Sequence, residues 1–117
     1  MSTATIATIS TDELQARFSQ DVGLHLWNVL SDEWFNGELI PGSRRVASDR
    51  LGEAVRRSTL PKDARIVVYC AGPSCPVSRQ AAEKLAAFGY THVEAYEGGL
   101  EEWKRAGFGV VGTGASA

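Results

Sequence analysis

The chain is poor in cysteine, histidine and net charge. Its 117 residues include two cysteines and two histidines, and the formal net charge is −2. Two cysteines cannot form the multiple disulfides of a small secreted domain, and neither histidine lies at ligand spacing for a four-ligand zinc site. The small negative charge gives no sign of the basic surface that attracts nucleic acids or anionic membranes. We expect no metal, no cofactor, and no nucleic-acid or membrane partner.

Long apolar runs are also missing. Nowhere do about 20 apolar residues follow one another, and the first ten residues, MSTATIATIS, lack the basic and apolar regions of a signal peptide. We therefore expect a cytoplasmic protein whose two thiols stay reduced. The length and the 44% hydrophobic composition suit one globular domain. We expect this domain over residues 6–111, with disordered ends at 1–5 and 112–117.

Strand and helix patterns alternate along this domain. Short apolar runs predict strands around 6–9, 24–29, 65–69, 92–96 and 108–111. Helical spacing and capping signals predict helices after residue 10, around 51–55, over 76–88 and over 98–107, with a short acidic helical turn within 31–43. Strands that alternate with helices form βαβ units. The sequence therefore predicts an α/β fold with a mostly parallel sheet covered by helices on both faces.

Two helices carry specific terminal signals. Ser10 and Glu13 form the S-x-x-E pattern of a capping box. The later helix is predicted to begin at Pro76 and to end at Gly89, which can adopt a left-handed conformation. Its predicted buried stripe consists of Val77, Ala81, Leu85 and Phe88.

Cys70 is the strongest candidate for a catalytic residue. It follows the apolar run RIVVY, and a helix is predicted to begin a few residues later. Ligands of parallel sheets bind outside the carboxyl ends of the strands, and a helix N-terminus lowers the pKa of a nearby thiol. These features predict a nucleophilic thiolate at Cys70. The alternative is an inert buried cysteine, because free cysteine is among the most buried residue types.

The segment after Cys70 could bind an anion. The small or turn-forming residues allow the backbone N–H groups to point inward as a nest, although two prolines contribute no N–H. We expect this candidate binding loop to comprise Ala71, Gly72, Pro73, Ser74 and Cys75, with Ser78 and Arg79 from the following helix. Arg79 could face the loop or solvent. Cys75 could fill the loop, replace a helix cap, or act as a resolving thiol that attacks a group formed on Cys70.

Several segments together resemble the rhodanese-like (sulfurtransferase) family. They are LHLWNVLSDEWFNGELIPGS, then RIVVYC with its small-residue loop and SRQAAEKLAAFGY, and finally VEAYEGGLEEWKRAGFGVV. The resemblance covers nearly the whole chain and implies a three-layer single-domain fold with a central sheet of about five strands. It also implies that Cys70 accepts a sulfane sulfur, carries it as a persulfide held by loop amides, and passes it to a thiol or to cyanide.

The chain departs from the family pattern at three places. Asn28 and Leu30 replace the usual Asp and Arg, and Glu38 and Leu39 occupy the place where a His is usual. The loop after Cys70 is about two residues longer than usual and carries no charge until Arg79, so thiosulfate is expected to be a poor donor, and neutral thiol or polysulfide donors are expected to serve as well. Two alternatives stay open, namely a thiol-redox switch that uses a disulfide between the two cysteines, and a non-catalytic binding module. The oligomeric state is not predicted.

Overall fold

The computed structural model describes residues 7–20, 24–30, 33, 35, 37–57, 59–72 and 75–112. Its main sheet has five parallel strands in the order β1-β6-β5-β2-β4. These strands are β1 (Ala7–Thr8), β2 (His25–Asn28), β4 (Arg44–Arg45), β5 (Arg65–Tyr69) and β6 (His92–Tyr96). A second pair, β3 (Glu38–Leu39) and β7 (Val111–Gly112), is antiparallel. The predicted α/β fold with a parallel sheet is confirmed.

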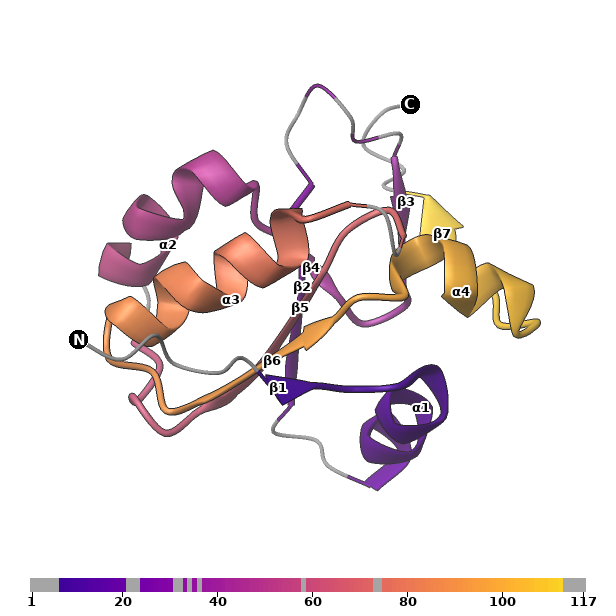
Figure 1. Cartoon of the computed structure of the whole chain (residues 1–117), viewed down its shortest axis with the longest axis horizontal. Coiled ribbons are helices and arrows are strands. Elements are labelled where there is room, and N and C mark those ends of the chain that lie inside the picture. Colours follow the sequence, from indigo (N-terminus) through magenta and orange to yellow (C-terminus); the bar gives the residue numbers. More distant parts are fainter. Residues whose placement is uncertain are drawn as a thin grey trace.

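Helices cover both faces of the sheet, as Figure 1 shows. On one side lie α2 (Leu51–Arg57), which follows the short 3-10 helix η1 (Ser48–Arg50), and α3 (Val77–Ala87). On the other side lie α1 (Thr11–Gln20) and α4 (Gly99–Arg105). The molecule therefore has three layers, with the sheet in the middle.

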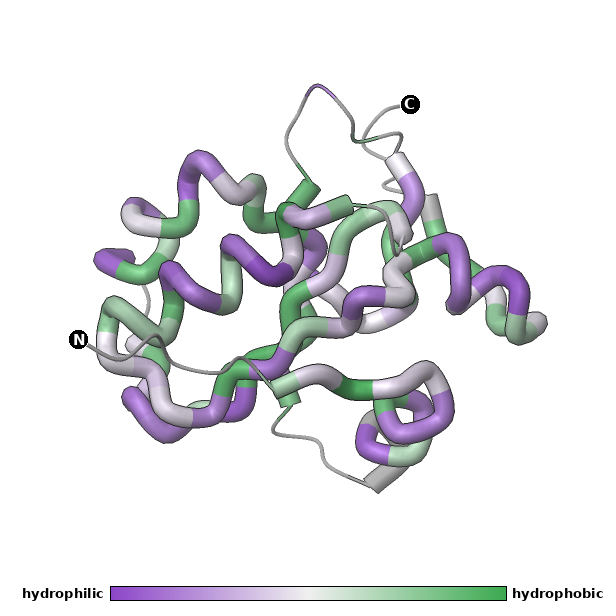
Figure 2. Tube along the Cα trace, in the orientation of Figure 1, coloured by the Kyte–Doolittle hydropathy of each residue, from purple (hydrophilic) through white to green (hydrophobic). Residues whose placement is uncertain are grey.

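The central strand β5 contributes to two separate hydrophobic clusters. Ile66 and Val68 pack against the α2 and α3 side, whereas Val67 and Tyr69 pack against the α1 and α4 side. Successive side chains of a strand point to opposite faces, and helices cover both faces here, so all four side chains are fully buried. Figure 2 shows the corresponding pattern, with hydrophobic residues along the central strands and hydrophilic residues on the outer sides of the helices. A strand buried on both faces needs no polar alternation, which explains its continuous apolar run.

The local helix signals are confirmed with small changes. The Ser10 hydroxyl accepts from the Glu13 N–H at 3.1 Å, and the Glu13 carboxylate accepts from the Ser10 N–H at 3.1 Å, so the capping box forms. Pro76 is the cap residue of α3 rather than its first helical residue. Gly89 follows the end of this helix with φ +103°, as its position predicts.

One prediction is wrong, and another falls mostly outside the described residues. The acidic helical turn expected within 31–43 cannot be followed, and Glu38 and Leu39 of this segment form a strand, not predicted from the sequence, that pairs with β7. Ser31, Asp32, Trp34 and Asn36 lie outside the described residues. Phe88 does not complete the buried stripe of α3, since it follows the last helical residue and is 43% exposed.

The ends of the chain are described only in part. Residues 1–6 and 113–117, which include nearly all of the expected disordered ends, lie outside the described residues. Gly112, the first residue of the expected tail, is the last residue of β7. None of the helices in the described ranges is long and apolar enough to cross a membrane.

Candidate active site

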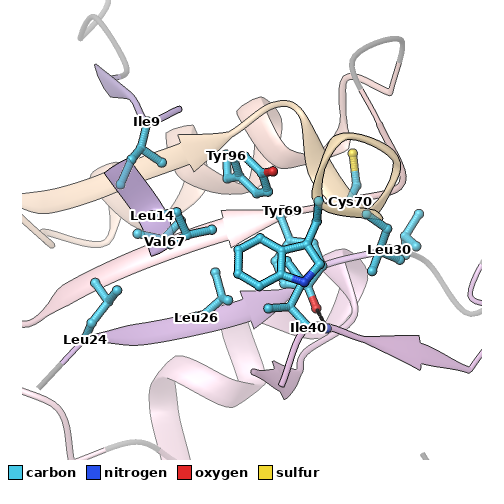
Figure 3. Close-up of a cluster of buried hydrophobic side chains, with 12 residues drawn as sticks. Ile9, Leu14, Leu24, Leu26, Leu30, Ile40, Val67, Tyr69, Cys70 and Tyr96 are labelled. Carbon is cyan, nitrogen blue, oxygen red and sulfur yellow. Dashed lines mark hydrogen bonds between the residues drawn. The ribbon is translucent and has the colours of Figure 1, made fainter. Parts of the chain in front are cut away.

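Cys70 directly follows β5 at the carboxyl edge of the parallel sheet. The residue has no exposed surface and belongs to the cluster between the sheet and α1 and α4. Figure 3 shows its sulfur pointing away from the aliphatic side chains that line this face. The sulfur therefore lies where the strand gives way to the loop, as the sequence predicts for a nucleophile.

The N-terminal end of α4 holds the first residues of the loop. The Leu100 N–H donates to the Cys70 carbonyl at 3.0 Å, and the Glu101 N–H donates to the Ala71 carbonyl at 2.8 Å. The close approach of the start of α4 to the loop backbone depends on Gly99, which has φ +61°. A Cβ atom there would lie 2.4 Å from the Cys70 carbonyl oxygen. The second glycine of the EGGLEEW segment is thus required by the geometry of the site, a role that sequence reasoning did not assign to it.

Cys75 closes the loop over the Cys70 thiol. Its N–H donates to the Gly72 carbonyl at 3.0 Å, and the Cys70 Sγ–H donates to the Cys75 carbonyl at 3.4 Å. Both cysteines are free, and Cys75 is half-buried against the cluster that contains Cys70. Pro73 and Ser74, the other predicted loop residues, lie outside the described residues.

The pKa of Cys70 differs from the sequence-based expectation. Burial raises the pKa of this thiol to about 11, and a hydrogen bond with the Cys75 side chain adds to the increase. Backbone hydrogen bonds from Ser78 and Gly72 act in the opposite direction but are weaker. The prediction of a lowered pKa is wrong because loss of solvation outweighs the loop and helix amides. The resting residue is a neutral thiol.

Ser78 and Arg79 occupy different environments. Ser78 is fully buried at the start of α3, and its backbone forms a hydrogen bond with the Cys70 thiol. Its side-chain hydroxyl has no hydrogen-bond partner among the described residues. Arg79 is half-exposed, and its Nε atom lies 3.8 Å from the Glu97 carboxylate. Ser78 therefore joins the candidate site, whereas the charge of Arg79 is directed toward an acidic residue.

A buried polar network supports the same edge of the sheet. The Tyr69 hydroxyl accepts from the Ile40 N–H at 3.0 Å and lies 2.8 Å from the Ser43 hydroxyl. Asn28, also fully buried, accepts from the Leu30 N–H at 3.1 Å through its side-chain oxygen. These bonds tie the IPGS segment to the strand that precedes Cys70. Sequence reasoning missed the role of Tyr69, although a polar aromatic residue directly before the nucleophile was the available signal.

A family model for the rhodanese-like domain matches residues 10–106. The chain belongs to the rhodanese-like family. No curated protein matches the chain significantly. In the described parts of this rhodanese-like domain, no three metal-ligating side chains are grouped where they could hold an ion.

Solved structures similar to this rhodanese-like domain include proteins of different lengths. The BH2092 protein of Bacillus halodurans has a TM-score of 0.80 at 26% identity, covering 92% of this chain and 77% of its own. Thiosulfate sulfurtransferase from Pseudomonas aeruginosa has a TM-score of 0.77 at 25% identity, covering 90% of this chain but only 20% of its own. A human single-domain sulfurtransferase has a TM-score of 0.74 at 21% identity, covering 86% of this chain and 97% of its own. The fold therefore occurs in known sulfurtransferases.

Proposed function

We propose that this rhodanese-like domain is a sulfurtransferase that carries sulfane sulfur as a persulfide on Cys70. The main support is the position of this thiol at the carboxyl end of β5, where backbone hydrogen bonds from Gly72 and Ser78 favour its charged form. Backbone donors around a sulfur atom stabilise negative charge on a second sulfur bound to it, as they do in an oxyanion hole.

The reaction has two steps that need no metal or organic cofactor. The Cys70 thiol first loses its proton to solvent. The thiolate then attacks the outer sulfur of a donor R–S–S⁻, the donor S–S bond breaks, and R–S⁻ leaves. An acceptor thiolate or cyanide then attacks the outer sulfur of the Cys70 persulfide, and Cys70 leaves as a thiolate. Sulfur is transferred without net oxidation. Because Cys70 has no exposed surface, a reactant reaches its sulfur only when described residues packed around it, such as Cys75, move aside.

The charges around the loop favour some donors over others. A Cβ on Gly72 would lie 2.5 Å from a Glu101 carboxylate oxygen, so this acidic side chain packs directly over the loop. Arg79, the nearest cation in sequence, is directed toward Glu97. The other Glu101 oxygen lies 2.9 Å from Arg105, so these paired side chains give a thiosulfate dianion little net attraction, which supports the expectation that thiosulfate is a poor donor.

Mass spectrometry after incubation with sulfane donors tests this proposal. Transfer of one sulfur by nucleophilic capture adds about 32 Da to the peptide that contains Cys70. We expect this adduct with inorganic polysulfide and glutathione persulfide, and we expect Cys75→Ser to retain it. Cys70→Ser should abolish it. Absence of the adduct with every donor, or its persistence in Cys70→Ser, would contradict the proposal.

A second candidate function is a dithiol redox switch, favoured by the hydrogen bond between the two cysteine side chains. Loss of two hydrogens to an added oxidant would join Cys70 and Cys75 in a disulfide. Mild oxidation with diamide, followed by mass spectrometry, separates the two functions. A disulfide that forms readily in a protein that never acquires a persulfide would favour the switch. Persulfide turnover that is unchanged in Cys75→Ser would favour the carrier.

A further inference from the structure

An arginine-rich pocket of about 430 Å³ lies at the β4 edge of the sheet. We call it the arginine pocket. It is formed by β4 and the segment that follows it, by η1 and by α2. Its lining residues are Arg44, Arg45, Val46, Ala47, Arg50, Glu53, Ala54 and Arg57.

The charge of the arginine pocket is opposite to that of the whole chain. Four arginines and one glutamate give its lining a net charge of +3, whereas the chain has −2. The glutamate, Glu53, is 3.0 Å from Arg57 in an exposed pair that contributes little by itself. All four cations are arginines, whose planar guanidinium groups bind phosphate and carboxylate through paired hydrogen bonds. The pocket therefore suits an anion with more than one negative charge.

The strand register connects this pocket to the candidate active site. Arg45 lies beside Asn28 in the parallel sheet, and Asn28 lies beside Tyr69, the residue before Cys70. Two strand spacings of about 5 Å place the Arg45 backbone about 10 Å from that of Tyr69. The Arg45 guanidinium also lies 4.1 Å from the centre of the Phe35 ring, which packs against the cluster that contains Cys70. The η1 and α2 part of the pocket lies on the face of the sheet opposite the cluster that contains Cys70, so a ligand must be well over about 10 Å long to reach the sulfur.

One acidic residue borders the loop on its other side. The Glu101 carboxylate packs over Gly72, where a Cβ would lie 2.5 Å from one of its oxygens, and its other oxygen lies 2.9 Å from Arg105. This ion pair leaves the α4 side of the loop close to neutral, while the β4 side carries the net positive charge of the arginine pocket. The difference favours an anionic reactant with its charged end toward the arginine pocket.

We propose that the arginine pocket binds the charged end of a polyanionic thiol that accepts sulfur from Cys70. This inference rests on the proposed persulfide function. The acceptor thiolate attacks the outer sulfur of the Cys70 persulfide, the bond to Sγ breaks, and the acceptor leaves as R–S–S⁻ while Cys70 regains its thiolate. The acceptor class is a thiol that carries phosphate groups or several carboxylates. The pocket contributes to specificity, and the sulfur chemistry stays with Cys70.

Single-turnover transfer from the loaded protein tests this proposal. The protein is loaded with inorganic polysulfide and freed of excess, and the loss of the persulfide is followed with coenzyme A, the peptide acetyl-Cys-Gly-Gly-Gly-Asp-Asp or 2-mercaptoethanol as acceptor. The extended peptide separates its thiol from its carboxylates by about 16 Å at about 3.3 Å per residue. The test variant is Arg44→Gln/Arg57→Gln, and the matched control Arg56→Gln/Lys84→Gln removes the same charge outside the pocket. We expect the test variant to slow transfer to the two anionic thiols by about tenfold, since each lost ion contact weakens binding severalfold. The rate of transfer to 2-mercaptoethanol should change by less than about twofold, because this neutral thiol has no charge that the arginines could contact.

The possible outcomes separate this inference from the function on which it rests. Three results would overturn the pocket assignment while the persulfide function stands. They are an equal loss of transfer rate in the control variant, an equal loss with 2-mercaptoethanol, and no loss with the anionic thiols. If only coenzyme A or only the acidic peptide responds, the acceptor class narrows to phosphates or to carboxylates. If no persulfide forms, the proposed function fails, and the acceptor role of the pocket fails with it. Titration of the protein with coenzyme A then shows whether the arginines bind an anion at all.

Discussion

Substitution of Gly99 by alanine would disturb the contact between α4 and the loop that follows Cys70. At φ +61° an alanine costs about 1–2 kcal/mol relative to its preferred conformations. Its Cβ would also lie 2.4 Å from the Cys70 carbonyl oxygen and 2.8 Å from the Gly72 nitrogen, so the loop must move. That movement breaks the bonds from Leu100 and Glu101 to the loop carbonyls, at about 0.5–1.5 kcal/mol each. Together these terms predict a loss of about 2–5 kcal/mol in the free energy of unfolding.

Gly107 provides the matched control, because it follows the other end of the same helix. It has φ +93°, but a Cβ at this position would meet nothing within 4 Å. Gly107→Ala should therefore show only the conformational cost of about 1–2 kcal/mol. Urea denaturation measures both free energies, and at about 4 °C per kcal/mol the Tm should fall by about 8–20 °C for Gly99→Ala and about 4–8 °C for the control. Equal losses would refute the argument that contact with the Cys70 loop requires glycine.

Two further predictions concern the thiol and the polar network beside it. Because burial raises the pKa of Cys70 to about 11, its thiolate fraction and its alkylation by iodoacetamide should rise about tenfold per pH unit up to that value. Cys75→Ala should move the midpoint to lower pH, whereas a wild-type midpoint below pH 8.5 would contradict the burial argument. Tyr69→Phe should cost about 1–3 kcal/mol in urea denaturation, because it leaves the Ile40 amide and the Ser43 hydroxyl without their shared partner. Unchanged stability would show that those hydrogen bonds contribute nothing.

Features that depend on neighbours in the chain were predictable from sequence. The capping box needs only Ser10 and Glu13 at the right spacing, and it forms. The left-handed conformation of Gly89 follows from its place just after a helix. The continuous apolar run before Cys70 indicated a strand covered on both faces, which β5 is. Each of these signals is local, so no knowledge of distant residues was needed.

Features that depend on distant partners were missed. In the sequence, Glu38 and Leu39 follow a predicted acidic turn and carry no strand signal. They form a strand because β7, from the end of the domain, pairs with them. Phe88 continues the apolar spacing of α3, but the helix ends before it, which leaves the ring partly exposed. The arginines of β4, η1 and α2 are separated in the sequence, and only the fold brings them together around one pocket.

The sequence by itself determined that Cys70 directly follows a buried parallel strand, which places the thiol at the edge of the sheet where ligands bind. Tertiary structure decided the chemical state of that thiol. The loop and the packed helices remove it from solvent, so its pKa rises although a helix N-terminus lies nearby. Tertiary structure also brought Gly99 against the loop from a separate helix. The solvation and the close contacts of a side chain depend on every element packed around it. The sequence pattern near that residue describes only the strand or helix in which it lies.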